Sequence, residues 1–224
     1  MTRIIYEEMI GFEEEMSEKV FHDRSWLITL YYPLLVHGHA GGKWDHIIDC
    51  GIHLGYYSLK YANFFNSVSS IDGKIRCKID VPNVTTYEEC LSHTVGNTVT
   101  WFEVPYDTAL STINKSYLWN NMTKDNFDQV ETETRTTNTL DNLINKPVDL
   151  LKVDCEGSDA DILMGAENLI KEYKPTIVAD HQCHLVERVC LSLGYKKVKQ
   201  FEQFHLIVFF YIKVIDILLK MYII

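Results

Sequence analysis

The chain has 224 residues, of which 46% are hydrophobic and 12% aromatic, enough for the core of one large α/β domain. Its formal net charge of -10 argues against a nucleic-acid partner, because proteins that bind phosphate backbones present a basic face. The six cysteines include no Cys-x-x-Cys pair, and the acidic N-terminus lacks the apolar segment of a secretion signal. We therefore expect a cytoplasmic setting.

Three segments are expected along the chain. Residues 1–43 are predicted to be an N-terminal helical segment and linker, because apolar residues such as Met9 and Phe12 recur at helical spacing among glutamates. Residues 44–212 should form the main domain, and residues 213–224 an apolar tail. Charged residues interrupt the apolar C-terminal stretch, so no transmembrane span is expected. The tail would either mediate a homodimer or lie against the core.

In the main domain, segments typical of strands alternate with segments typical of helices. The expected strands lie in HIIDCG, SVSSID, NVTTYEECLS, NTVTWFEV, VDLLKVDC, TIVAD, KKVKQF and FHLIVFFYI. The last two follow one another too closely for a crossover, so the last strand should be antiparallel. This order predicts an α/β fold with a doubly wound, mostly parallel sheet, and seven of these strands are expected to form that seven-stranded sheet.

Two connections depart from the usual lengths. KIRCKIDVP, between the second and third strands, is too short for a crossover helix and is predicted to be a bare loop or a single turn. Residues 105–136 are polar with little periodicity, which predicts an unusually long loop. Within it, Tyr117 and Trp119 would either stack on a sugar ring or fasten the loop to the core.

Two short motifs are typical of helices in the second half of the domain. SDADILMGAENLIKEY is predicted to be one continuous helix, with Ser158 as its N-cap and Pro175 after its end. TLDNLI is predicted to be a short helix that Thr139 or Asn138 caps.

The first strand ends in Asp49, and Gly51 and Gly55 follow before the next helix. In an open parallel sheet, ligands bind beyond the carboxyl ends of the strands, and a glycine there lets the backbone approach them closely. Asp49 stands where the dinucleotide motif has its first glycine, so it would repel a pyrophosphate and suit an ammonium group. Asp72, at the end of the next strand, is placed to bind ribose hydroxyls.

Together these features point to S-adenosyl-L-methionine as the cofactor. The alternative is that both acids have only a structural role. Asp49 would then cap the next helix, and Asp72 would lie in an ordinary turn. A nicotinamide-dependent oxidoreductase is disfavoured by the acid at the strand end and the missing middle glycine.

The sequence resembles the FkbM-like methyltransferases over roughly residues 44–210. IIDCGIHLGYYSL is similar to the first motif of that family, and LLKVDCEGSDADILMGAENLI to its second signature. PTIVAD and NVTTYEECLS are similar to two of its other strands. The resemblance implies a class I, Rossmann-like methyltransferase domain over residues 44–212. It also implies methyl transfer to an oxygen of a sugar, a glycan or another small hydroxylated acceptor.

The resemblance also implies site residues. Those expected to bind the cofactor are Asp49, Gly51, His53, Gly55, Asp72 and Ser92. The candidates for the base that takes the proton of the acceptor hydroxyl are Asp154, Glu156 and His181, and the choice among them stays open. Glu156 could instead be a structural acid bonded to loop amides, and His181 a surface residue. No metal is predicted.

The chain departs from the family pattern at several positions. His53 stands where the family usually has Asn, Ile52 where it has Ala, and Asp159 where it has Glu. The connection after Asp72 is also shorter than the helix that the family places there. The alternative reading is therefore a catalytically inactive methyltransferase-fold binding or scaffold protein.

Overall fold

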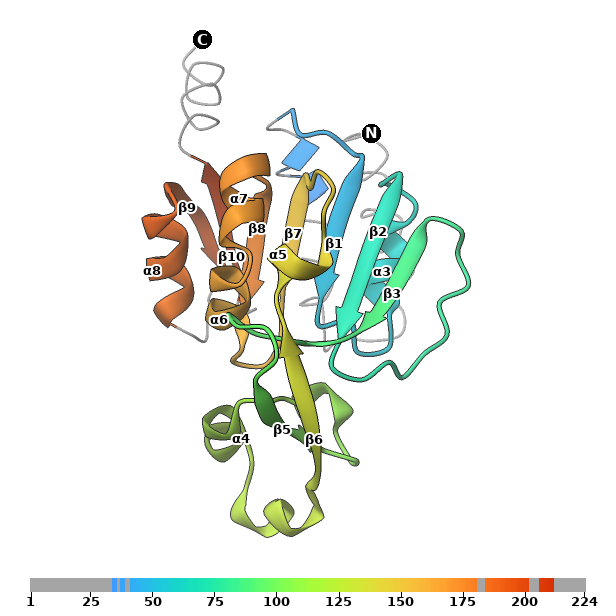
Figure 1. Cartoon of the computed structure of the whole chain (residues 1–224), viewed down its shortest axis with the longest axis vertical. Helices are drawn as coiled ribbons and strands as arrows, with labels where there is room; N and C mark the ends of the chain where they lie inside the picture. The colour runs from blue at the N-terminus through green and yellow to red at the C-terminus, as the bar shows by residue number, and fades with distance from the viewer. Residues whose placement is uncertain (1–33, 36, 39–40, 181–183, 202–205, 212–224) are drawn as a thin grey trace, which may run out of the picture.

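The computed structural model describes residues 34–35, 37–38, 41–180, 184–201 and 206–211. Most of the expected N-terminal helical segment and all of the C-terminal tail lie outside these residues. At the centre is a seven-stranded sheet with the order β3-β2-β1-β7-β8-β10-β9 (Figure 1). Its strands are β1 (His46–Cys50), β2 (Ser67–Asp72), β3 (Val84–Glu88), β7 (Leu150–Val153), β8 (Thr176–Asp180), β9 (Tyr195–Phe201) and β10 (Leu206–Tyr211).

The direction of the strands confirms the predicted doubly wound sheet. Strands β3, β2, β1, β7 and β8 pair in parallel, whereas β10 is antiparallel to both of its neighbours, β8 and β9. Every residue of β1, β7 and β8 is buried, as expected for central parallel strands that helices cover on both faces. The last strand is therefore the antiparallel one, as its short connection predicted.

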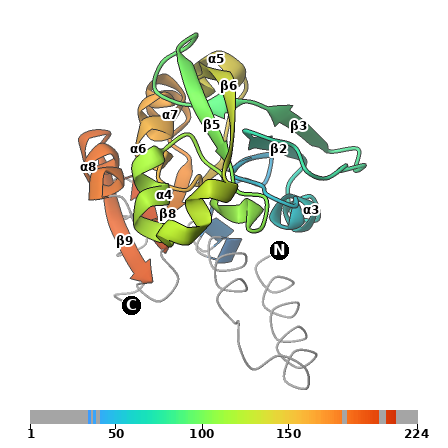
Figure 2. The ribbon, with the colours of Figure 1, turned by 90° about the horizontal axis from the view of Figure 1, so that it is seen from below.

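Helices lie on both faces of this sheet (Figure 2). The helices are α3 (Tyr56–Tyr61), α5 (Leu140–Leu143), α6 (Asp159–Met164), α7 (Glu167–Tyr173) and α8 (His184–Ser192). Helices α5 and α7 cover one face, and α3 lies on the other. No helix among the described residues is long and apolar enough to cross a membrane.

The predicted continuous helix over residues 158–173 is wrong, because the chain breaks it into α6 and α7 at Gly165 and Ala166. A Cβ at Gly165 would lie 2.1 Å from the carbonyl oxygen of Ser92, so a distant strand end packs at the break. Asp141 of α5 accepts hydrogen bonds from the backbone N–H groups of Asn168 and Leu169. A side chain distant in sequence thus satisfies the donors that the break exposes.

The predicted long loop is also wrong, because residues 90–138 form a small three-stranded unit, here called the insert. Its elements are β4 (Cys90–Leu91), β5 (Thr98–Glu103), η1 (Thr108–Leu110), α4 (Lys115–Asn121), η2 (Lys124–Gln129) and β6 (Glu131–Asn138). The strand order is β4-β6-β5, and the insert extends beyond the end of the sheet where β1, β2 and β7 finish (Figure 1). Most of β6 is exposed, so it lacks the apolar alternation that predicts a strand.

Two local predictions are confirmed. Residues 74–82 contain no helix, so the connection between β2 and β3 is a bare loop. Thr139 caps α5, since its side chain accepts a hydrogen bond from the backbone N–H of Asn142. Ser158, by contrast, makes no capping hydrogen bond through its side chain.

Candidate active site

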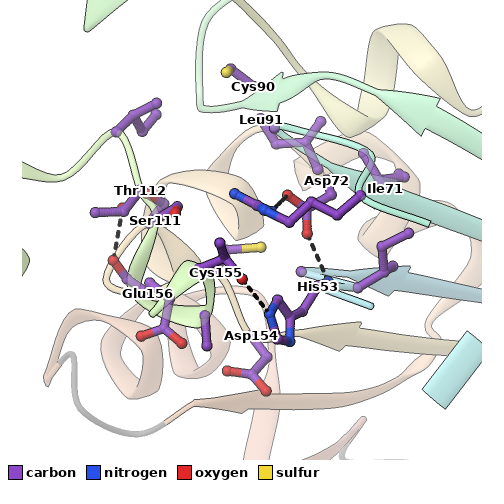
Figure 3. A pocket seen from close by; sticks show the side chains of 18 of the residues that line it. His53, Ile71, Asp72, Cys90, Leu91, Ser111, Thr112, Asp154, Cys155 and Glu156 are labelled. Atoms are coloured by element: carbon purple, nitrogen blue, oxygen red, sulfur yellow. Dashed lines mark hydrogen bonds and ion pairs between the residues drawn. The ribbon is translucent and has the colours of Figure 1, made fainter. Parts of the chain in front are cut away.

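A cavity of about 620 Å³ lies at the carboxyl ends of β1, β2 and β7, and residues of the insert, among them Ser111 and Thr112, line its other side (Figure 3). This is within the usual size of a small-molecule site. Five of the residues predicted for the site line it, namely Gly51, His53, Asp72, Asp154 and Glu156. The topology of the sheet therefore brings the expected acids of β2 and β7 to one cavity.

The glycines of the β1 turn are needed for close contact with neighbouring loops. Gly51 has φ +80°, and a Cβ there would lie 1.7 Å from the carbonyl oxygen of Asp154. Its N–H donates to the carbonyl of Ile71 at 2.9 Å, so the turn is held between the ends of β2 and β7. Gly55 has φ +72°, and a Cβ there would lie 2.7 Å from Ile79. Both positions require the conformational freedom of glycine.

His53 and Asp72 connect the β1 turn to the end of β2. The backbone N–H of His53 donates to Asp72 Oδ2 at 2.9 Å, and that of Lys74 donates to Oδ1 at 3.1 Å. The His53 ring is fixed from the insert, with Nε2 2.8 Å from the hydroxyl of Thr108. Burial raises the pKa of Asp72 and outweighs these hydrogen bonds, which lower it.

Asp49 does not line the cavity but lies beneath it in the core. Its Oδ2 accepts a hydrogen bond from the Ser58 hydroxyl at 2.7 Å, and its Oδ1 lies 3.1 Å from Nζ of Lys152. Asp49 is 0% and Lys152 1% exposed, and the contact is an ion pair without the alignment of a hydrogen bond. Lys152 Nζ also lies 3.7 Å from Asp154 Oδ2. Burial lowers the pKa of Lys152, but the two aspartates outweigh it and raise that pKa.

The turn after β7 presents Glu156 to the cavity. Glu156 has φ +49°, and Asp159 holds the turn by accepting hydrogen bonds from the N–H groups of Cys155 and Gly157 at 3.0 and 3.2 Å. The hydroxyl of Thr112, in the insert, donates to the Glu156 carbonyl at 2.9 Å. The turn and the insert therefore fix this glutamate together.

Glu156 is the acid whose environment favours proton uptake near neutrality. Burial raises its pKa to about 7, and the charges of Asp154, Asp159 and Asp107 act in the same direction. A hydrogen bond from Tyr117 in α4 opposes the rise. Burial likewise raises the pKa of Asp159, to about 6. Such shifts are frequent where a carboxyl group serves as an acid or base.

Two cavity residues on the side of β2, and the acid that holds them, could not be recognised from the sequence. Trp101 of β5 donates from Nε1 to Glu103 Oε2 at 2.9 Å, and Arg76 donates to the same oxygen at 2.8 Å. Nη1 of Arg76 lies 3.6 Å from Asp72 Oδ1. Arg76 and Trp101 line the cavity, and Glu103 holds both. They belong to segments that were predicted only as a loop and a strand, and their spacing forms no motif.

The remaining expected residues lie elsewhere. Ser92 does not line the cavity, and its backbone N–H donates to the carbonyl of Asn138. Gly55 lies beside the cavity but is not among its lining residues. His181 lies outside the described residues. Within the described part of the chain, no three His, Cys, Asp or Glu side chains are grouped to hold a metal ion.

Of the two aromatic residues singled out in the sequence, Tyr117 belongs to the site and Trp119 does not. Tyr117 hydrogen-bonds to Glu156. Trp119 is 53% exposed and stacks on Phe127, with the ring centroids 4.3 Å apart. Neither residue lines the cavity directly.

Comparison with known proteins gives one family match. A sequence model of the methyltransferase FkbM domain matches residues 49–213. That range contains both glycine and acid motifs, the insert and the last strand. No curated protein matched the chain.

Several solved structures are similar to the chain. A methyltransferase FkbM from Methylobacillus flagellatus KT has a TM-score of 0.47 and 16% identity over 91% of this chain, which spans only 59% of that protein. A Streptococcus mutans protein in complex with SAH has a TM-score of 0.40 and 9% identity, covering 80% of this chain and 96% of its own. A SAM-dependent methyltransferase from Aquifex aeolicus has a TM-score of 0.39 and 14% identity, covering 84% and 93%.

Proposed function

The chain belongs to the FkbM methyltransferase domain family, and on that premise we propose that it transfers a methyl group from S-adenosylmethionine to a hydroxyl group. The acceptor would be a sugar, a glycan or another small hydroxylated compound. The observation that carries the proposal is the position of Glu156, a half-buried acid at the cavity whose pKa is raised to about 7.

Glu156 suits the role of general base toward a hydroxyl acceptor. Methyl transfer to an alcohol oxygen requires that the hydroxyl proton leave as the oxygen attacks. A carboxyl group with a pKa of about 7 is partly ionised at neutral pH, and its carboxylate is basic enough to accept the hydroxyl proton. Tyr117 and the turn fixed by Asp159 hold the glutamate at the cavity. Asp154 lines the same cavity and remains a second candidate.

The cavity fits a nucleoside-containing cofactor. Each carboxylate oxygen of Asp72 accepts one backbone hydrogen bond and keeps acceptor capacity for a ribose hydroxyl. Gly51 and His53 form the turn that would hold the amino-acid end. S-adenosylmethionine, when bound, supplies an electrophilic methyl group, so the chain has mainly to align the acceptor with it.

The first test is calorimetric titration of the protein with S-adenosylhomocysteine. We expect a micromolar dissociation constant, about -8 kcal/mol. The Asp72→Asn variant should bind at least about tenfold more weakly, because it loses a charged acceptor for the ribose. Asp80→Asn is the matched control, since Asp80 is 85% exposed and lies outside the cavity. No binding by the folded wild-type protein would reject the proposal and favour the inactive scaffold.

The second test separates cofactor binding from proton removal. Glu156→Gln should bind S-adenosylhomocysteine like the wild type but lose about 10²- to 10⁴-fold in the rate of transfer from labelled S-adenosylmethionine to a panel of sugars. Transfer at the wild-type rate would exclude Glu156 as the base. Asp154→Asn, measured in parallel, would then show whether the neighbouring acid takes that role.

A further inference from the structure

The insert closes the side of the cavity that the short connection after β2 leaves open. Residues 74–82 contain no helix, and Trp101 of β5 occupies the space beside them. A Cβ on Gly73 would lie 2.2 Å from Cζ3 of Trp101. The indole ring therefore packs directly on the backbone of the residue that follows Asp72.

Two side chains hold this ring in place. Glu103 accepts hydrogen bonds from Trp101 Nε1 and from Arg76, and the centre of the Arg76 guanidinium lies 5.9 Å from the Trp101 ring centroid. Burial alone would raise the pKa of Glu103, but its hydrogen bonds from Trp101 and Arg76 outweigh burial and lower it. Glu103 thus carries the charge that fixes both partners.

Arg76 connects the ring to the acid at the end of β2. Its Nη1 lies 3.6 Å from Asp72 Oδ1, and its side chain is 11% exposed. Its Nε is buried and has no hydrogen-bond partner among the described residues. A buried donor that the chain leaves unused, beside a cavity, is available to an acceptor on a ligand.

We propose that Trp101 is a cofactor-contacting residue, forming the wall on which the purine base of the adenosyl group packs, and that Arg76 fastens this wall to Asp72. The inference rests on the proposed function, because it assumes that Asp72 binds the ribose. The base is attached to that ribose, so it must extend past Asp72, and Trp101 lines the cavity beside Gly73. A purine packs well on an indole ring.

If Trp101 carries the purine base, the insert takes part directly in ligand binding. A purely structural tryptophan would not do so. Trp101 is 5% exposed, so it could in principle serve only to fill the core. In that case its replacement would lower stability and leave the affinity of the folded protein for its ligands unchanged. If it carries the base, its replacement should weaken every ligand that contains adenine by a similar factor.

The test compares Trp101→Leu with Trp119→Leu, because Trp119 is exposed and outside the cavity. Each variant is titrated calorimetrically with S-adenosylhomocysteine and with adenosine. Trp101→Leu should bind both ligands about 10- to 100-fold more weakly, the usual range for loss of an aromatic ring that stacks on a base. Trp119→Leu should bind both like the wild type.

Trp101→Phe is the second variant, for the case that Trp101→Leu does not fold. S-adenosylhomocysteine should change the tryptophan fluorescence of the wild type and of Trp119→Leu, and this change should be lost in folded Trp101→Phe. Unchanged affinities together with a retained fluorescence change would overturn the inference and leave the proposed function standing. Failure of the folded wild type to bind S-adenosylhomocysteine would overturn both.

Discussion

The two sides of the cavity are built in different ways. On the side of β1 and β7, backbone meets backbone, since a Cβ at Gly51 would lie 1.7 Å from the carbonyl oxygen of Asp154. On the side of β2, where the connection has no helix, side chains of the insert complete the wall, and a Cβ at Gly73 would meet the ring of Trp101. Where backbone meets backbone, only glycine fits at the contact position. Where side chains complete the wall, its composition depends on which distant segment of the chain packs there.

The largest expected effect tests the ion pair beneath the β1 turn. Lys152→Met should lower the free energy of unfolding by about 3–5 kcal/mol, because Asp49 is left buried without its cation. The double variant Asp49→Asn/Lys152→Met should recover most of this loss in chemical denaturation. Lys171→Met removes an exposed ion pair with Glu167 and should change stability by less than about 0.5 kcal/mol. A double variant as unstable as the single one would contradict the charge argument.

The next test asks whether the close backbone contact on the β1 side of the cavity is what requires glycine at residue 51. Gly51→Ala should cost about 3–4 kcal/mol, because the new Cβ overlaps the Asp154 carbonyl and the residue keeps a positive φ. Gly96→Ala is the control, with φ +83° and no atom within 4 Å of the new Cβ. It should lower the free energy of unfolding by only about 1–2 kcal/mol, which is the cost of the left-handed conformation alone. Equal losses in thermal denaturation would show that the contact adds nothing.

On the other side, Gly73→Ala should displace Trp101 rather than the backbone. We expect a loss of about 1–3 kcal/mol in stability, typical of overpacking, together with weaker binding of S-adenosylhomocysteine. Adding Trp101→Phe should recover stability, since phenylalanine lacks the ring atoms that the new Cβ meets, but should not recover binding. If Gly73→Ala binds the ligand like the wild type, the wall is not part of the binding site.

The smallest effect concerns pH. The pKa of Glu156 in the folded protein, about 7, exceeds its ordinary value of 4.5, so the folded state takes up this proton more readily than the unfolded state. Lowering the pH from about 7 to 4.5 should therefore stabilise the wild type relative to Glu156→Gln, by about 1–2 kcal/mol. Denaturation of both proteins at a series of pH values measures the difference. A difference that does not change with pH would mean that Glu156 titrates normally.

The sequence predicted the framework of the site well. The alternation of strands and helices gave the sheet and its antiparallel last strand, because these patterns are local and periodic. Gly51, Asp72 and Glu156 could be expected to lie at one cavity because each lies at or just after the end of a strand, and parallel strands bring their carboxyl ends together. Asp49 also ends a strand and was expected to bind the cofactor, but its position in the core could not be predicted in this way. Only the packing shows that its carboxylate faces Lys152.

What the sequence by itself determined is the succession of strands and helices, the direction of the strands and the backbone turns at their ends, since strand periodicity, glycine and short connections act locally. What only the tertiary structure decided is the partner of each buried group. The break between α6 and α7 depends on Asp141 and on the carbonyl of Ser92. The wall beside Asp72 depends on Trp101, which packs on Gly73 across the chain. Such contacts join segments far apart in sequence, and no local pattern encodes them.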